Sequence, residues 1–168
     1  MQKILIIGSP GSGKSTFALK LGRMLNLPVK HLDSHFWNPG WIETPESEWR
    51  EIVTELISGD KWIIDGNYSH TFDIRFPAAD TIIFLDFPTR ICMWRVFKRI
   101  FKGYGKVRSD LAVGCPEKID FVFFKWVWTF RKKHRTQTLK LLDEYSKTKN
   151  IITITSSSQL SDYLENIS

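Results

Sequence analysis

The sequence predicts an α/β fold with a central parallel sheet, and three observations point to it. Apolar runs at residues 4–7, 62–65, 81–86 and 151–154 alternate with segments of helical periodicity, which is the pattern of repeated strand–helix–strand units. These runs are apolar at nearly every position, as in strands that helices cover on both faces. The first run also leads into a glycine-rich loop followed by an amphipathic segment, which is the setting of a phosphate-binding loop.

In the first half of the chain, a helix is expected after the glycine-rich loop, because Phe17, Leu21 and Leu25 recur on one helical face. Residues 29–32 are expected to form a short second strand, which a loop rich in Trp, Pro and Gly follows. Thr44 is expected to cap the next helix, with Pro45 at its first position. The third strand is expected at residues 62–65.

In the second half, the fourth strand is expected at residues 81–86, and Pro88 opens a helix that runs to about residue 102. The polar, basic and glycine-containing residues 103–116 are expected to form a mobile lid. A long helix over about 117–146, a fifth strand at 151–154 and a short amphipathic helix complete the chain. Residues 1–168 contain no internal repeat and no linker, so we expect a single domain.

The composition limits the class of protein. The chain has 168 residues, of which 42% are apolar and 25% are charged, and this suits one globular domain. Cys92 and Cys115 are too few and too far apart to indicate a disulfide framework, which favours a cytoplasmic setting. We expect no signal peptide, because the short N-terminal apolar run continues into the loop. We expect no membrane span, because the longest apolar run is far shorter than the roughly 20 residues that a bilayer requires.

Residues 8–16 fit the pattern G-x-x-x-x-G-K-[ST], which predicts a site for a nucleoside triphosphate. Glycines let backbone N–H groups point at a polyphosphate, and the loop ends at a helix N-terminus, where the helix dipole favours an anion. Lys14 is expected to contact the β- and γ-phosphates of ATP, and Ser15 is expected to hold Mg²⁺. The predicted nucleotide-binding residues of the loop are Gly8, Ser9, Pro10, Gly11, Ser12, Gly13, Lys14, Ser15 and Thr16.

Three aspartates follow the predicted strands, at the edge where open parallel sheets bind their ligands. Asp65 ends the third strand and fits the acidic residue that holds the metal through water in phosphate-loop enzymes; a turn-forming role is the alternative. Asp33 follows the second strand and is expected to orient or deprotonate an acceptor hydroxyl, unless it only orders the loop after it. Asp86 ends the fourth strand.

Four arginines are candidates for contacts with phosphate or with the acceptor. Arg95 and Arg99 lie four residues apart on the helix after the fourth strand, and we expect them to bind the nucleotide and to stabilise the transferring phosphoryl group. Arg108, in the lid, is expected to close onto the same phosphates. Arg75, shortly after the third strand, is a candidate for binding an anionic acceptor. For each of them, a solvated surface position is the alternative.

The basic residues are concentrated in one part of the chain. Residues 89–135 contain thirteen Lys and Arg but only three Asp and Glu, although the whole chain has a net charge of +6. This asymmetry indicates an anionic partner. Six aromatic residues within 121–130 and the basic run at 131–135 leave a nucleic-acid partner open, although such aromatics also suit a core. His31 and His35 flank a strand end, and this placement disfavours a metal pair.

The same blocks of sequence resemble known families. Those at 8–16, 65–66, 86–88 and 95–99 resemble the adenylate kinase-like nucleoside monophosphate kinases. The chain is more similar to the bacterial DNA topology modulation proteins, a branch of that superfamily, in His-Leu-Asp at 31–33, Pro-Gly-Trp at 39–41, Asp-Gly-Asn-Tyr at 65–68 and Cys-Met-Trp-Arg at 92–95. The resemblance implies a three-layer P-loop NTPase fold with sheet order 2-3-1-4-5, an acceptor site near the second strand and a lid after the fourth-strand helix.

By position, the resemblance also implies roles for single residues. Asp65 matches the aspartate that holds the magnesium water, and Arg95 and Arg99 match arginines that meet adenine and the ATP phosphates. Gly-Asn-Tyr-Ser at 66–69 stands where adenylate kinases have Gly-Phe-Pro-Arg, so AMP is not the expected acceptor, and Asp33 is placed like the catalytic aspartate of uridine and shikimate kinases. The sequence therefore predicts an ATP- and Mg²⁺-dependent phosphotransferase with a small, unidentified acceptor. The alternative is a nucleic-acid-associated ATPase.

Overall fold

A computed structural model describes residues 1–108 and 110–167. Its main sheet has five parallel strands, which adjoin in the order β2-β5-β1-β6-β7. Counted along the chain within this sheet, the order is 2-3-1-4-5, so the predicted α/β fold and sheet order are confirmed. The strands of this sheet are β1 (Lys3–Gly8), β2 (Val29–His31), β5 (Trp62–Asp65), β6 (Thr81–Leu85) and β7 (Asn150–Ile154).

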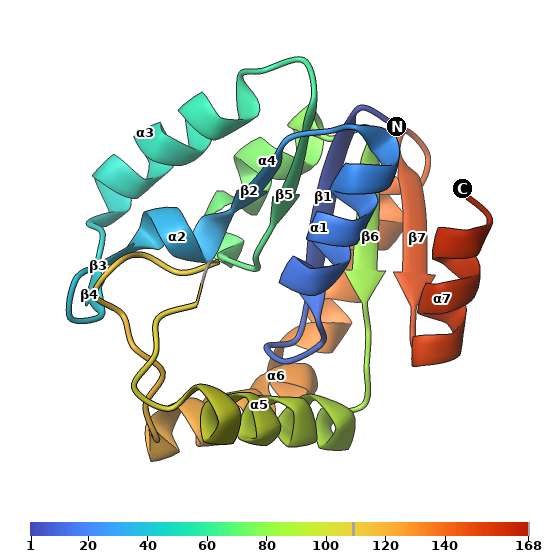
Figure 1. The fold of residues 1–168 in the computed structure, drawn as a ribbon. Helices are drawn as coiled ribbons and strands as arrows, with labels where there is room; N and C mark the ends of the chain where they lie inside the picture. Colours follow the sequence, from blue (N-terminus) through green and yellow to red (C-terminus); the bar gives the residue numbers. More distant parts are fainter. Residues whose placement is uncertain (109, 168) are drawn as a thin grey trace.

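Helices cover both faces of this sheet and give it three layers (Figure 1). One face packs against α1 (Lys14–Leu25) and α7 (Ser157–Glu165), and the other against α3 (Glu46–Ile57) and α4 (Phe72–Ala78). Helix α5 (Thr89–Gly103) passes beyond the carboxyl ends of the strands, and the long helix α6 (Phe121–Tyr145) continues from there along the α3–α4 side (Figure 1). The phosphate-binding loop, between β1 and α1, therefore faces α5.

The core lies on both sides of β1, β5 and β6, whose apolar residues are almost fully buried. Alternate residues of one strand enter different clusters: Ile4 and Ile6 pack toward α1 and α7, whereas Leu5 and Ile7 pack toward α3 and α4. Each such side chain contributes about 1.5–3 kcal/mol relative to an exposed one. Burial on both faces explains why the strands are apolar without alternation. Each strand ends where polar residues replace the apolar ones.

Two short pieces of structure differ from the sequence-based expectation. Residues expected as a loop form a helix α2 (Leu32–Phe36) and a two-stranded hairpin, β3 (Trp37–Asn38) with β4 (Ile42–Glu43). A 3₁₀ turn η1 (Ser69–Thr71) and α4 lie between β5 and β6, where no element was expected. Thr44 does not cap α3, because its hydroxyl donates to the Phe36 carbonyl oxygen at 2.6 Å, and Pro45 occupies the capping position.

The connection between α5 and α6, residues 104–108 and 110–120, contains most of the predicted lid and docks onto the β3–β4 hairpin; residue 109 of the predicted lid lies outside the described residues. The Gly40 amide donates to the Gly114 carbonyl oxygen at 3.0 Å, and the Trp41 indole donates to the Pro116 carbonyl oxygen at 3.2 Å. Gly114 has a φ of +86°, which favours glycine. The predicted lid is thus held against the hairpin in this structure.

Among the described residues, no helix combines the length and the apolar character that a bilayer crossing requires.

Candidate active site

The glycine-rich loop wraps tightly between β1 and α1. Gly11 and Gly13 have positive φ values of +79° and +96°, and Gly13 takes the capping position of α1 without any side-chain cap. A Cβ atom at Gly11 would lie 2.4 Å from the Cys92 carbonyl oxygen of α5, so only glycine allows the loop to approach that helix so closely. The start of α1 consequently presents free backbone N–H groups, as an anion site requires.

Lys14 folds back over this loop. Its ammonium group donates to the carbonyl oxygens of Gly8 and Ser9, at 3.0 and 3.1 Å. Desolvation lowers the pKa of Lys14, although the nearby Asp33 and Asp65 act in the opposite direction. The Ser12 hydroxyl is buried and has no hydrogen-bond partner among the described residues. A polar atom buried in this way is normally paired, so the loop has the character of a site built to receive an anion.

Asn67 clamps the start of the loop from the neighbouring strand β5. Its amide nitrogen donates to the Gly8 carbonyl oxygen at 2.6 Å, and its side-chain oxygen accepts from the Gly8 amide at 3.0 Å. This two-way contact holds the chain between β1 and the loop at a position where Gly8 has a φ of +150°. The sequence alone did not indicate this contact between Asn67 and Gly8.

Ser15, Asp65 and His31 form a chain of polar contacts at the ends of β5 and β2. The Ser15 hydroxyl donates to Asp65 Oδ2 at 2.9 Å, and the other carboxylate oxygen makes a short contact with His31 Nδ1. Burial alone would lower the pKa of His31, but the hydrogen bond to Asp65 and the negative charges of Asp65, Asp110 and Asp33 together outweigh burial and raise the pKa. A serine hydroxyl beside a carboxylate is an oxygen donor set of the kind that Mg²⁺ prefers. These residues therefore fit the predicted metal site.

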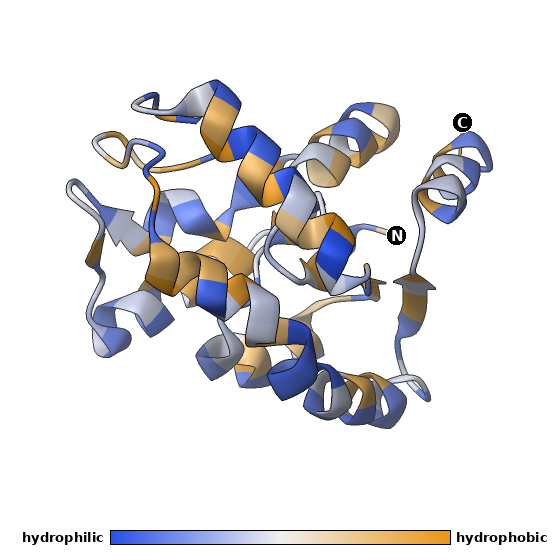
Figure 2. Ribbon diagram, turned by 90° about the horizontal axis from the view of Figure 1, so that it is seen from below, coloured by the Kyte–Doolittle hydropathy of each residue, from blue (hydrophilic) through white to orange (hydrophobic). Residues whose placement is uncertain are grey.

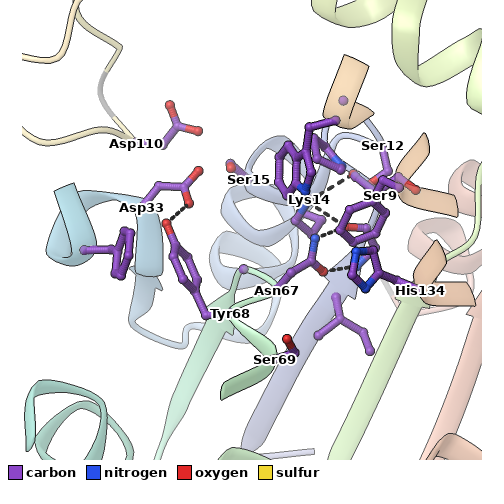
Figure 3. Close-up of a pocket in the computed structure, with 18 of the residues that line it drawn as sticks. Ser9, Ser12, Lys14, Ser15, Asp33, Asn67, Tyr68, Ser69, Asp110 and His134 are labelled. Carbon is purple, nitrogen blue, oxygen red and sulfur yellow. Dashed lines mark hydrogen bonds between the residues drawn. The ribbon is translucent and has the colours of Figure 1, made fainter. Parts of the chain in front are cut away.

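Asp33 and Tyr68 lie opposite the loop, on another wall of the same cavity (Figure 3). The Tyr68 hydroxyl donates to Asp33 Oδ1 at 2.6 Å. Burial raises the pKa of Asp33, while the bond from Tyr68 partly opposes this rise. Tyr68 adopts a φ of +36°, which is uncommon for a residue with a side chain, and this turn directs its ring toward α2. A carboxyl group with a raised pKa in a cavity suits proton transfer.

The predicted nucleotide-binding arginines surround the loop at different distances. Arg95 touches it, because one guanidinium nitrogen donates to the Ser12 carbonyl oxygen at 2.7 Å while the group lies over the Phe87 ring. Arg99 and Arg108 instead share the buried carboxylate of Glu117, at 2.8 and 3.0 Å. The structure thus brings Arg99 and the lid residue Arg108 together. It also reveals Glu117 as their common partner, which the sequence alone did not indicate.

Arg75 lies elsewhere, and its predicted contact with the acceptor needs correction. The side chain is fully buried, and its nitrogen atoms donate to the carbonyl oxygens of Gly66, Asn67 and Tyr68 and to the Thr71 hydroxyl. Burial lowers the pKa of Arg75 to about 9, so the group stays cationic at neutral pH. Its hydrogen bonds hold the turn that carries Tyr68. Arg75 is therefore a residue that supports the site from inside the fold.

Asp86, at the end of β6, ties the basic part of α6 to the sheet. Its buried carboxylate binds Arg131 Nε at 3.0 Å and Arg135 Nε at 2.7 Å. Part of the basic run considered for nucleic acid is thus engaged inside the molecule. Both arginines and His134 also line the cavity.

One cavity of about 2000 Å³ joins most of these groups, although His31, Asp65, Arg75 and Asp86 are not part of its lining. Its lining includes the phosphate-binding loop, Asp33, Tyr68, Arg95 and Arg108. Asp110, from the α5–α6 connection, reaches toward Ser15 and Asp33 (Figure 3). Because a pocket for one small ligand usually has about 300–1000 Å³, this cavity has room for two ligands side by side.

Comparison with protein-family models found no match, and comparison with curated proteins found none either. Among solved structures, the chain is similar to a shikimate kinase from Acinetobacter baumannii in complex with shikimate, with a TM-score of 0.62 and 15% identity over 99% of this chain and 90% of that one. Shikimate kinases from Bacteroides thetaiotaomicron (TM-score 0.56, 16% identity, 98% and 94% covered) and Aquifex aeolicus (TM-score 0.51, 18% identity, 98% and 92% covered) are also similar. At these identities the similarity establishes the P-loop NTPase fold.

Proposed function

We propose that this protein is an ATP-dependent phosphotransferase that uses Mg²⁺ and phosphorylates a hydroxyl group of a small acceptor. The observation that carries the proposal is the arrangement of two unlike walls around one cavity. One wall offers the backbone of the phosphate-binding loop, Lys14 and Arg95, and the other offers the half-buried carboxyl group of Asp33. The fold shared with three shikimate kinases supports this proposal.

In the proposed reaction, the acceptor oxygen attacks the γ-phosphorus of ATP. A new oxygen–phosphorus bond forms, the bond from the γ-phosphorus to the bridging oxygen breaks, and ADP leaves with that electron pair. Asp33 accepts the proton of the acceptor hydroxyl, for which it must lie within hydrogen-bond reach. Lys14, Arg95 and Arg99 stabilise the charge on the transferring group. Arg108 completes the enclosure from the lid side and helps to exclude water.

Ser15 and Asp65 are the residues that would hold Mg²⁺, on the basis of their 2.9 Å contact. The metal would neutralise phosphate charge and orient the nucleotide. His31 keeps Asp65 oriented through the second carboxylate oxygen, which is how outer residues usually support a metal ligand.

Replacement of Lys14 tests the proposal. Lys14→Ala should lower phosphoryl transfer by about 10²–10³-fold or more while the circular dichroism spectrum stays unchanged, since the side chain acts mainly through its charge. Lys61→Ala, an exposed lysine outside the cavity, is the control. Transfer would be measured with labelled ATP against a panel of nucleosides, nucleotides and sugars. Full ATP-dependent transfer by Lys14→Ala would refute the assignment.

A nucleic-acid-associated ATPase is the second candidate, and one surface favours it. Trp94, Phe97 and Phe101 on α5 are 66%, 58% and 82% exposed, and α5 contains five Lys and Arg but no acidic residue. Figure 2 views the molecule from the α5 side and shows hydrophobic and hydrophilic residues interleaved along the helices on that side. Aromatic rings among cations are what single-stranded nucleic acids stack on.

Stimulation of ATPase activity by oligo(dT) or oligo(U) at physiological salt distinguishes the second candidate. Phe101→Ala should weaken that stimulation, whereas Ile42→Ala, an exposed apolar residue on the hairpin, should leave it unchanged. Binding that disappears at modest salt, without any stimulation, would mark charge attraction only and would eliminate this candidate.

A further inference from the structure

The wall of the cavity around Asp33 is built from aromatic rings, a feature that the proposed transfer does not itself require. Phe36, Trp37, Trp49 and Tyr68 form what we call the aromatic cup, and all four line the cavity. The Phe36 ring lies at the centre, with centroid distances of 5.0 Å to Trp37, 5.1 Å to Trp49 and 4.6 Å to Tyr68. Trp49 and Tyr68 are themselves 5.0 Å apart.

Contacts around the cup hold these rings in place. The Tyr68 hydroxyl donates to Asp33 Oδ1 at 2.6 Å, and Arg75 fixes the Tyr68 turn from inside the fold. Trp49 is only 2% exposed, so α3 packing fixes its ring. Rigid rings lose little conformational entropy when a ligand binds, which makes such a wall an effective platform for a flat group.

The cup also contains one unused hydrogen-bond donor. The indole N–H of Trp49 is buried and has no partner among the described residues. A buried donor without a partner is costly in a folded protein and is usually satisfied by water or by a ligand.

The charges around the cup disfavour an anionic ligand. Residues 33–49 contain Asp33, Glu43, Glu46 and Glu48 but neither Lys nor Arg. Residues 66–72 contain no Asp, Glu, Lys or Arg. Arg75, the nearest arginine in sequence to the Tyr68 turn, is fully buried and spends its hydrogen bonds on that turn.

Cations elsewhere in the cavity belong to other walls. Lys14 and Arg108, which act electrostatically on Asp33, lie on the phosphate-loop and lid sides. On α6, Arg131 and Arg135 are bound to Asp86, and the cavity lining includes Lys140 together with Glu144. Lys118 is another cation near the cup, and its ammonium group lies 5.8 Å from the ring of Trp41, which neighbours Trp37. A carboxylate or phosphate placed in the cup would thus face carboxylates without a cation of the cup to hold it.

We propose that the acceptor is a flat, uncharged hydroxyl compound, for which a nucleoside is the representative chemical class, and that its ring stacks in the aromatic cup while its hydroxyl group meets Asp33. This inference rests on the proposed phosphotransferase function. It goes further by predicting selection against anionic acceptors, including nucleoside monophosphates and hydroxy acids.

Binding measurements test the inference without requiring turnover. Calorimetry on the full chain, with and without a non-hydrolysable ATP analogue and Mg²⁺, would compare adenosine and cytidine with AMP, shikimate, D-ribose and choline. We expect a nucleoside to bind at least about ten-fold more tightly than the other four, since stacking of one base on aromatic side chains is worth about 1–3 kcal/mol. Tighter binding of AMP, shikimate, ribose or choline, or no nucleoside binding at all, would overturn the inference.

A matched pair of variants locates the contact. Trp37→Leu should weaken nucleoside binding by about ten-fold or more, because Trp37 is a partly exposed ring of the cup. Trp128→Leu removes a ring that is 59% exposed and lies outside the cavity, and it should have no effect. Equal effects of the two variants would overturn the inference. Failure of the ATP analogue to bind would instead count against the phosphotransferase function, while the nucleoside measurement would still decide the acceptor class.

Discussion

The carboxyl group of Asp33 is half-buried in the wall of the cavity, and this position leads to a prediction about stability. Burial raises its pKa in the folded protein above the unfolded value, so the native state binds more protons and stability falls as pH rises between the two values. Asp33→Asn removes the ionisable group and keeps the shape. We therefore expect this variant to be more stable than the wild type near pH 8 and equally stable near pH 4, as measured by urea unfolding.

Phosphoryl transfer by Asp33→Asn should nevertheless fall by about 10²–10⁴-fold, the usual contribution of a general base. Glu165→Gln, at an exposed position of α7, is the control for removal of a carboxylate. A stability difference between Asp33→Asn and the wild type that does not change with pH would contradict the raised pKa of Asp33.

The hydrogen bond from Tyr68 to Asp33 leads to a second prediction at this site, about the pH profile of activity. Burial raises the pKa of Asp33, and the hydrogen bond from Tyr68 lowers it by stabilising the carboxylate. Tyr68→Phe keeps the ring in the cup but removes this bond, so the pKa of Asp33 should rise. The acidic limb of kcat/KM should then move to higher pH. Tyr104→Phe, at an exposed position on the α5–α6 connection, should leave the limb unchanged; a limb that stays in place in both variants would remove Asp33 as the titrating base.

Local sequence patterns predict the conformation of a continuous stretch of backbone better than contacts between distant residues. The phosphate-binding loop is such a stretch, and its glycines have the conformations that its motif requires. The contact of His31 with Asp65 was not predicted, because it depends on the sheet register that pairs these two residues across β2 and β5. The predicted role of Arg75 was wrong because its position depends on α4, a short helix interrupted by Pro77 that has weak sequence signals.

At the scale of elements, Glu117 joins α5 to the lid. This contact leads to a third prediction, about the stability of a Glu117 variant. Its carboxylate, 5% exposed, contacts Arg99 and Arg108, and its backbone pairs with Gly105 and Lys106. Glu117→Gln removes the negative charge between two arginines and should destabilise the protein by about 1–3 kcal/mol. This value lies below the 3–5 kcal/mol of a fully buried pair because the two arginine side chains are 31% and 22% exposed.

Nucleotide binding should compensate for this loss, since phosphates can replace the missing carboxylate between the arginines. We therefore expect a non-hydrolysable ATP analogue with Mg²⁺ to raise the Tm of Glu117→Gln more than that of the wild type. Glu55→Gln, on the exposed side of α3, serves as the reference. An identical rise in all three proteins would show that Arg99 and Arg108 do not meet the phosphates.

Among the elements, the long or doubly covered ones were predictable and the short ones were not. Strands β5 and β6 are apolar except for the terminal residues Asp65 and Thr81, and their predicted bounds agree with the structure to within one residue. The β3–β4 pair has only two residues in each strand, so no periodicity can appear. It exists because Gly40 turns the chain with a φ of +82° and because the α5–α6 connection packs on it. Such a contact is not visible in local sequence.

At the scale of the whole molecule, docking of the α5–α6 connection encloses the cavity between two parts of the chain that are far apart in sequence. The hydrogen bonds from the hairpin residues Gly40 and Trp41 to Gly114 and Pro116 hold the connection in place. In the proposed reaction, a cavity covered in this way would keep water from the transferring phosphoryl group. Docking should therefore control whether ATP reacts with the acceptor or with water.

Gly114→Ala tests this role of docking. Gly114 has a φ of +86°, and a Cβ atom there would lie 2.9 Å from Pro39 Cβ, so the variant should loosen the docked connection. We expect acceptor phosphorylation to fall by about ten-fold, ATP hydrolysis to rise relative to it, and hydrogen exchange in the connection to accelerate. Gly105→Ala is the matched control, because Gly105 also has a positive φ, +72°, but has no atom within 4 Å of an added Cβ. If both variants change the ratio of hydrolysis to transfer equally, backbone strain explains the effect; only a larger change in Gly114→Ala assigns it to the contact with the hairpin.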